Sequence, residues 1–227
     1  TCALVDMNTQ FGTVALAMDV REFSHTLADA VNDSDRMDEN LLRGMMNEHQ
    51  SGCFVLPAPL NVAELESFDP IKVRSVIQTA RKVYRFVVLD MPHEIDEVSI
   101  VGLDEADEIF LVCDMVLPSI RNTIRVLETL RELDYQDEKI KLIINKYYDS
   151  HQVSLDEIAK HVGVPIHWLV PYDSPAAIAA MNSGDTIDSV DPDSQAGHSL
   201  VALAQSTAGI VPQARTKRKR GFWSWTR

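Results

Sequence analysis

The most constraining feature of this sequence is an apolar run that stops abruptly at an acid. Residues 86–89 read FVVL, with no alternation of polar and apolar positions, and Asp90 and Pro92 follow. An unbroken run of this length is typical of a strand that is covered on both faces, as strands of a parallel sheet are. Proline cannot continue a central strand, so Asp90 is expected at the carboxyl edge of the sheet.

An acid at that edge suits two roles. Ligands of open α/β sheets bind at the carboxyl ends of the strands, where an aspartate can hold Mg²⁺ through water beside a nucleotide phosphate. The alternative is an aspartate that caps the next turn or helix. Asp90 alone does not distinguish metal binding from capping, so the residues at the other strand ends are needed to choose between the two roles.

A second strand also ends at an acid. Residues 2–5 are apolar and lead to Asp6, and the loop that follows contains Asn8. This loop can present both side chains to a metal-bound phosphate or to an attacking water. Alternatively, Asp6 or Asn8 caps a helix that begins at Val14.

A third strand, residues 140–144, is followed by Asn145, Lys146 and Tyr147. A carboxamide donates and accepts hydrogen bonds, so Asn145 can pair with the edge of adenine. An asparagine that ends the strand through an Asx turn is the alternative. The guanine signature NKxD is not met, because the acid falls at Asp149, one position too far.

The rest of the chain alternates short apolar runs with helical patterns. Further strands are predicted at residues 53–56, 109–113 and 166–170, and helices at 27–31, 41–46, 70–83, 98–103, 118–133, 154–161, 174–184 and 200–208. Residues 185–197 are polar and acidic and are interpreted as a linker or loop. The alternation predicts an α/β fold with a doubly wound, mainly parallel sheet, in which residues 1–210 form one domain.

Composition narrows the classes of function. The 227 residues are 45% hydrophobic and 24% charged, which is ordinary for a globular domain with a sizeable core. The three cysteines lie in or beside apolar runs and form no CxxC pair, which predicts reduced core residues in a cytosolic protein. Neither an HExxH metal motif nor a GxSxG nucleophile elbow occurs, which disfavours zinc and serine hydrolases.

Charge is distributed unevenly along the chain. Residues 215–227 hold six of the 21 basic residues and none of the 34 acidic ones, so the rest carries 15 basic and 34 acidic residues, a net charge of −19. An acidic body argues against broad nucleic-acid binding. The tail at residues 211–227 combines its basic cluster with Phe222, Trp223 and Trp225, which predicts weak attachment to an anionic membrane surface. A solubilising tail or a docking peptide for a protein partner is the alternative.

Four segments in order, LVDMNTQFG, FVVLDMPHEID, LIINKYYD and VPYDSPAAIAAMNSGDTI, resemble the ATPase domain of the MinD and ParA superfamily. The nearest resemblance is to its pilus-assembly branch, the CpaE and TadZ type proteins of tight-adherence (Flp) pili. The resemblance implies a P-loop NTPase fold that binds ATP and Mg²⁺. It implies Asp6 as the switch I acid and Asp90 as the Walker B acid, both catalytic and metal-binding, with Asn8 beside them and Pro92 in switch II. The adenine pocket is implied at Asn145, Lys146, Pro171, Tyr172 and Asp173.

Two departures from the family pattern affect activity. The glycine-rich, lysine-bearing P-loop that precedes the first switch strand is not present, so we expect a missing first strand and poor ATP binding by the chain as given. Asn8 stands where the family commonly has a second acid, which predicts slow hydrolysis. The resemblance implies a homodimer with Mg·ATP at its interface that positions pilus secretion machinery, cytoplasmic or peripheral at the inner membrane or cell pole. A catalytically inactive scaffold is the alternative.

Overall fold

The computed structural model describes residues 1–61, 64, 68–149 and 154–210. The basic and aromatic tail proposed as a membrane attachment, residues 211–227, lies outside the described residues.

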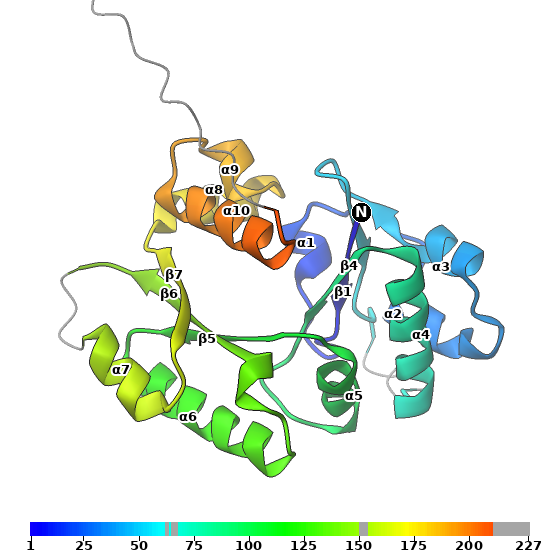
Figure 1. Ribbon diagram of the computed structural model, residues 1–227. Coiled ribbons are helices and arrows are strands. Elements are labelled where there is room, and N and C mark those ends of the chain that lie inside the picture. Colours follow the sequence, from blue (N-terminus) through cyan, green and yellow to red (C-terminus); the bar gives the residue numbers. More distant parts are fainter. Residues whose placement is uncertain (62–63, 65–67, 150–153, 211–227) are drawn as a thin grey trace, which may run out of the picture.

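The described strands form two hydrogen-bonded sheets (Figure 1). Sheet A has the order β2-β3-β1-β4, with β1 at Cys2–Asp6, β2 at Asn47–Glu48, β3 at Cys53–Leu56 and β4 at Phe86–Asp90. Sheet B has the order β5-β6-β7, with β5 at Ile109–Asp114, β6 at Ile140–Tyr147 and β7 at Ile166–Pro171. Every pairing is parallel except that of β2 with β3. The predicted α/β fold, with mainly parallel strands flanked by helices, is confirmed.

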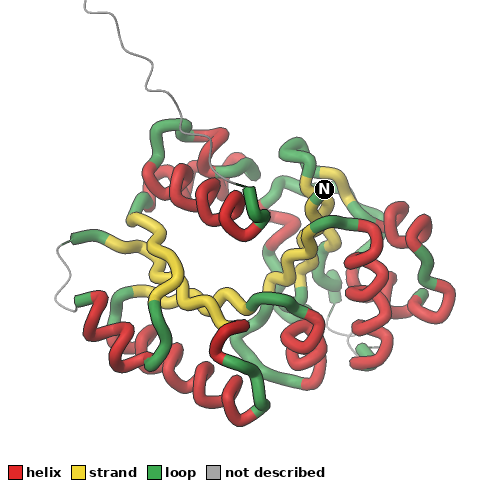
Figure 2. The backbone as a smooth tube through the Cα atoms, viewed as in Figure 1, coloured by secondary structure: helices red, strands yellow, loops and turns green. Residues whose placement is uncertain are grey.

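Helices lie on both sides of the strands, as Figure 2 shows. On one side are α4 (Pro70–Val83), α5 (Glu97–Glu105), α6 (Leu117–Glu132) and α7 (Leu155–Val162). On the other are α1 (Val14–Ala17), α8 (Ser174–Ser183), α9 (Ile187–Val190) and α10 (Gln195–Thr207). Two further helices, α2 (Leu27–Asn32) and α3 (Glu39–Met45), pack against α4, and short 3-10 turns lie at Ser34–Arg36 and Asp137–Lys139.

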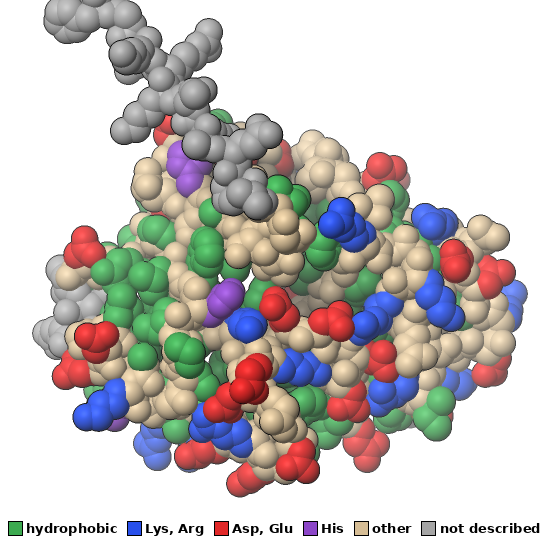
Figure 3. All heavy atoms as spheres, viewed as in Figure 1, with side chains coloured by type: hydrophobic (Ala, Val, Ile, Leu, Met, Phe, Trp, Pro, Cys, Tyr) green, Lys and Arg blue, Asp and Glu red, His purple; other side chains and the backbone are tan. Residues whose placement is uncertain are grey.

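Helix α5 ties the two halves of the molecule together. Towards sheet A, Arg74 of α4 donates to the Glu105 carboxylate at 2.6 Å. Towards sheet B, the Tyr135 hydroxyl donates to Asp104 at 2.6 Å and the Lys139 ammonium donates to the Leu103 carbonyl at 2.7 Å. Acidic and basic side chains are interspersed over this part of the surface (Figure 3). These hydrogen bonds connect the two sheets through α5, although no strand pairing among the described residues joins them.

The core is divided in the same way as the sheets. One buried cluster packs β1 and β3 against α2, α3 and α4, and a second packs β5 and β6 against α6 and α7. A small third cluster is formed by Ile143, Val170 and Ala196, the last of which belongs to α10. The helix caps follow the sequence: Asp38, Asp96, Ser154 and Asp173 each accept a hydrogen bond from a backbone N–H in the first turn of the helix that follows.

Three local predictions are wrong. Strand β6 extends to Tyr147, so Asn145 and Lys146 lie within the strand and no Asx turn ends it at Asn145; a register irregularity between Ile144 and Tyr147 absorbs the extra residues. Residues 185–197 contain α9 and the start of α10, because Thr186 and Ser194 cap these helices. Strand β4 is not covered on both faces, since Val88 is 51% exposed.

The cysteines are free, as predicted, but not all are core residues. Cys113 is buried, whereas Cys2 and Cys53 are half-buried partners on the paired strands β1 and β3. A hydrogen bond from Cys53 lowers the pKa of the Cys2 thiol to about 7.

Candidate functional site

Asp6 and Asp90 lie side by side at the carboxyl ends of two paired strands. They are register partners in the parallel pair β1–β4, and the Met7 N–H donates to the Asp90 carbonyl at 3.0 Å just beyond them. Adjacent strands are about 4.8 Å apart, so the two side chains share one small region. Asp6, Asn8 and Asp90 are called the A rim below.

The Asp6 carboxylate organises the loop that follows β1. The residue is 1% exposed, and its two oxygens accept hydrogen bonds from the Asn8 and Val14 N–H groups, each at 3.1 Å. The bond to Val14 is the helix-capping interaction that the sequence offered as an alternative role for Asp6. Gly12 allows this packing: a Cβ there would lie 2.4 Å from an Asp6 carboxylate oxygen and 2.3 Å from Ala58 Cβ.

Both acids of the A rim are held in conditions that disfavour their charged forms. Burial raises the pKa of Asp6 against the opposing effect of its two backbone hydrogen bonds, and the negative charge of Asp90 raises it further. Desolvation likewise raises the pKa of Asp90, with His93 acting in the opposite direction. A bound cation would relieve both effects, because it removes the repulsion and replaces lost hydration.

Asn8 supports the loop and is not aimed at Asp90 by any hydrogen bond of the described residues. Its side-chain oxygen accepts from the Phe11 N–H at 3.3 Å, which closes an Asx-type turn. The carboxamide nitrogen makes no described hydrogen bond and is available to a ligand.

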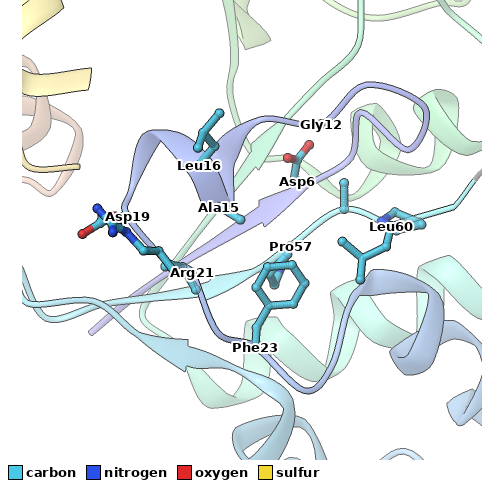
Figure 4. Close-up of a pocket in the computed structure, with 12 residues that line it drawn as sticks. Asp6, Gly12, Ala15, Leu16, Asp19, Arg21, Phe23, Pro57 and Leu60 are labelled. Carbon is cyan, nitrogen blue, oxygen red and sulfur yellow. Dashed lines mark hydrogen bonds and ion pairs between the residues drawn. The ribbon is translucent and has the colours of Figure 1, made fainter. Parts of the chain in front are cut away.

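A pocket of about 390 Å³ opens beside Asp6. Figure 4 shows the Asp6 carboxylate next to Gly12, with Phe23, Pro57 and Leu60 on the other side of the pocket. The lining combines the buried Asp6 and the exposed ion pair of Asp19 with Arg21 with apolar and small side chains.

A second group of side chains lies at the carboxyl end of sheet B. Asp114 and Asn145 are register partners on β5 and β6. Lys146 adopts the left-handed conformation, with φ 55°, and its ammonium forms an ion pair with Asp114 at 2.7 Å. A non-glycine residue in this conformation is uncommon and marks a position fixed by its surroundings.

The β7–α8 connection completes this group. The Tyr172 N–H donates to the Tyr147 carbonyl at 2.8 Å, and the Tyr172 ring packs edge-on against Tyr148 with 6.1 Å between centroids. Asp173 accepts from the Ala176 N–H at 3.3 Å and from the Ser194 hydroxyl at 2.6 Å. The B rim is defined as Asp114, Asn145, Lys146, Pro171, Tyr172 and Asp173.

The structure therefore brings the sequence-selected residues into two groups. Among the described residues, no hydrogen bond or strand pairing joins the A rim to the B rim, and the pocket beside Asp6 is lined by neither Asn145 nor Tyr172. Two residues with a part in these groups were not selected as site residues from sequence. Asp114 ends an apolar run as Asp6 and Asp90 do, so the same signal was available; the need for Gly12 appears only in the packing.

The A rim has the donor set that a magnesium ion requires from a protein. Mg²⁺ binds through one or two carboxylates and keeps several waters, and Asp6 and Asp90 supply two adjacent carboxylates. In the part of the chain that the structure describes, no three His, Cys, Asp or Glu side chains gather into a site of the kind that binds a metal by protein ligands alone. The residues thus fit a cation shared with a ligand.

Comparison with known proteins supports a relationship to one superfamily. No family model matches the sequence. A ParA family ATPase from Chlorobium tepidum is 28% identical, with a TM-score of 0.84 over 89% of this chain and 85% of that one. The septum site-determining protein MinD of Pyrococcus horikoshii, solved with Mg-ADP, is 19% identical, with a TM-score of 0.76 over 91% and 82%. The MinD of Thermotoga maritima is 24% identical over 190 residues, which cover 82% of this chain and 68% of that protein.

The fold defines the class: an α/β fold with mainly parallel strands flanked by helices, which matches that of the P-loop NTPase neighbours. Sequence relatives and structural neighbours together support a place for this chain in the MinD/ParA superfamily of ATPases.

Proposed function

We propose that this chain belongs to a positioning ATPase and carries its switch residues, Asp6 and Asp90. The ATPase binds Mg·ATP between two copies of itself. The observation that carries the proposal is the register pairing of Asp6 with Asp90 at the carboxyl ends of two parallel strands. Two neighbouring carboxylates that repel one another and are partly desolvated favour a site completed by a cation.

Each rim has a distinct part in this proposal. Asp90 holds Mg²⁺ through water and Asp6 fixes the switch loop beside it, while Asn8 orients the attacking water without adding charge. When bound, Mg²⁺ neutralises charge on the phosphates. The adenine pocket is made by Asn145 and Lys146 with the backbone and ring of Tyr172, flanked by Pro171 and Asp173. The exposed Tyr148 and Tyr172 rings support this assignment, because an aromatic face stacks on a base.

The partner and cellular address follow from the resemblance to the pilus-assembly branch. The ATPase cycle is proposed to drive dimerisation and separation, and thereby to position Flp-type pilus secretion machinery rather than to make a product. The MinD of Thermotoga maritima is named as a septum site-determining protein, which is consistent with a positioning role. No helix among the described residues is long and apolar enough to cross a membrane. Attachment to an anionic membrane surface is assigned to residues 215–227.

ATP turnover by the complete gene product tests the proposal. We expect turnover in the wild type and its loss in Asp90→Ala, with the fold checked by circular dichroism. Asp193→Ala, at an exposed acid with no described partner for its carboxylate, is the matched control and should keep full turnover. Equal rates for the wild type and Asp90→Ala would remove Asp90 from the mechanism.

A catalytically inactive scaffold is the second candidate. Two observations favour it: Asn8 supplies no charge, and both Asp6 oxygens are already engaged by backbone N–H groups. The upstream coding sequence separates the candidates. A lysine-bearing, glycine-rich loop there supports the ATPase, and its absence supports the scaffold.

A further inference from the structure

Two of the three free cysteines lie directly opposite one another in sheet A. Cys2 of β1 and Cys53 of β3 are register partners in a parallel strand pair. Residues paired in this way project their side chains to the same face of the sheet, and their Cα atoms are about 4.8 Å apart. This separation falls within the roughly 4.4–6.8 Å that a disulfide spans. The third cysteine, Cys113, is paired with Ile144 instead.

The pair also differs from Cys113 in its access to solvent. Cys2 and Cys53 are both half-buried, so each keeps a surface that solvent reaches, whereas Cys113 is fully buried. A small reagent that reacts with thiols is therefore expected to reach the pair before it reaches Cys113.

The two thiols of the pair are not equivalent. A hydrogen bond from Cys53 has the largest influence on Cys2, and it lowers the pKa of the Cys2 thiol to about 7 although burial acts in the opposite direction. The same hydrogen bond, together with burial, raises the pKa of the Cys53 thiol. Cys2 is therefore the thiol that ionises near neutral pH, and the thiolate is the nucleophile in sulfur chemistry.

A buried hydroxyl lies near the second thiol. Tyr84 is 4% exposed, and its hydroxyl has no hydrogen-bond partner among the described residues. Burial raises the pKa of Tyr84, Arg43 acts against this, and negative charge on Cys53 raises the pKa further, so the ring is close to that sulfur. An O–H donor near a thiolate stabilises its charge. The fold therefore leaves a hydrogen-bond donor unused beside the pair.

We propose that Cys2 and Cys53 form a redox-modification site that exchanges with low-molecular-weight disulfides and closes to an internal disulfide. The Cys2 thiolate attacks one sulfur of the reagent and expels the other as a thiolate, which takes a proton from solvent, so that a mixed disulfide forms on Cys2 Sγ. Cys53 then loses its proton to solvent and attacks Cys2 Sγ, which releases the second thiol. The two cysteines lose two electrons in total, and the reagent gains them as it is reduced to two thiols.

The order of the two attacks follows from the difference between the thiols. Once Cys2 carries the mixed disulfide, its negative charge is gone, and with it a cause of the raised pKa of Cys53. The new bond joins the amino ends of β1 and β3 and encloses the loop that follows Asp6. It should therefore stabilise the segment that carries Asp6 against unfolding. This inference does not rest on nucleotide binding.

Reaction with glutathione disulfide at neutral pH tests the inference on the chain of residues 1–227. The reaction is quenched with acid, free thiols are alkylated, and peptides are mapped by mass. We expect an internal Cys2–Cys53 disulfide in the wild type and in the control Cys113→Ala. In Cys53→Ser, a glutathione adduct should accumulate on Cys2, because the second attack is lost. A wild type that stays reduced, that keeps glutathione on Cys2 without closing, or that forms disulfides only between two chains would overturn the inference.

Two further readouts separate a reactive pair from two cysteines that are merely close. Iodoacetamide at neutral pH should alkylate Cys2 roughly fivefold more slowly in Cys53→Ala, which lacks the hydrogen-bond donor, than in the wild type, while Cys53→Ser keeps a donor and most of the rate. Oxidation should raise the urea midpoint of the wild type but not that of Cys53→Ser. Equal alkylation rates in the wild type and Cys53→Ala, together with an unchanged urea midpoint after oxidation, would contradict the proposed site.

Discussion

The A rim and the B rim lie at equivalent positions of the two sheets but are built differently. In the A rim, the Asp90 carboxylate has no hydrogen-bond partner among the described residues; burial raises the pKa of Asp6, and partial desolvation raises the pKa of Asp90, which is otherwise exposed. In the B rim, the Asp173 carboxylate accepts hydrogen bonds from the Ala176 N–H and the Ser194 hydroxyl, and Asp114 forms an ion pair with Lys146. The acids of the B rim thus support the fold, whereas Asp90 at the A rim is exposed, has a raised pKa and has no described partner that stabilises its charge.

The largest expected effect concerns the loop of the A rim. Gly12→Ala should destabilise the protein by about 1–3 kcal/mol, because the new Cβ would clash with Ala58 and with the Asp6 carboxylate. The free energy of unfolding in urea measures this. Gly44→Ala is the control: a Cβ there meets nothing within 4 Å, so this change in helix α3 should stabilise by about 0.5–1 kcal/mol. A neutral Gly12→Ala would contradict the close packing of the loop.

The next effect tests the supporting role of the B rim. Asp173→Ala removes the cap of α8 and leaves the Ser194 hydroxyl without its acceptor, so a loss of about 1–2 kcal/mol is expected. Asp173→Asn keeps an acceptor oxygen and should lose less. Urea unfolding monitored by circular dichroism compares them. If both variants were as stable as the wild type, Asp173 would not contribute to the stability of the fold.

A pH series tests the opposite role of the A rim. Because the pKa of Asp90 is raised in the folded protein, the native state binds more protons than the unfolded state above the ordinary value of 3.8. The Asp90 carboxyl therefore has no effect on stability below that pH and becomes unfavourable as pH rises through its folded pKa. Asp90→Asn should gain stability over the wild type as pH rises to neutrality, while Asp193→Asn should not. A constant difference at all pH values would contradict the desolvation of Asp90.

The smallest effect concerns the exposed ion pair of the B rim. Lys146→Ala should cost at most about 1 kcal/mol, because Lys146 is largely exposed and its attraction to Asp114 is screened. The loss should shrink at high salt. A loss above about 2 kcal/mol that is independent of salt would mean that Lys146 contributes to the fold in another way.

Sequence patterns predicted the fold well because the local signals were strong. The apolar runs that became β1, β3, β4, β5 and β7 were visible directly. Residues 185–197 were misinterpreted as a linker because their acidic composition outweighed the capping signals at Thr186 and Ser194. Exposure of Val88 could not be predicted, because a continuous apolar run reports what a strand can bury and not what lies over it.

The candidate site was predicted in part. The pairing of Asp6 with Asp90 follows from acids at the ends of two apolar runs, since parallel strands bring their carboxyl ends to one edge. The ion pair of Lys146 with Asp114 could not be predicted from the sequence, because it depends on the left-handed backbone at Lys146 and on the register of β5 with β6.

The most direct test of the central claim, that the A rim binds a divalent cation together with a nucleotide, is Mn²⁺ binding in the presence of ATP, followed by electron paramagnetic resonance on the complete gene product. We predict bound Mn²⁺ in the wild type and in Asp193→Asn, at an exposed acid outside both rims, and its loss in Asp6→Asn and Asp90→Asn. Full Mn²⁺ binding by Asp90→Asn would contradict the account.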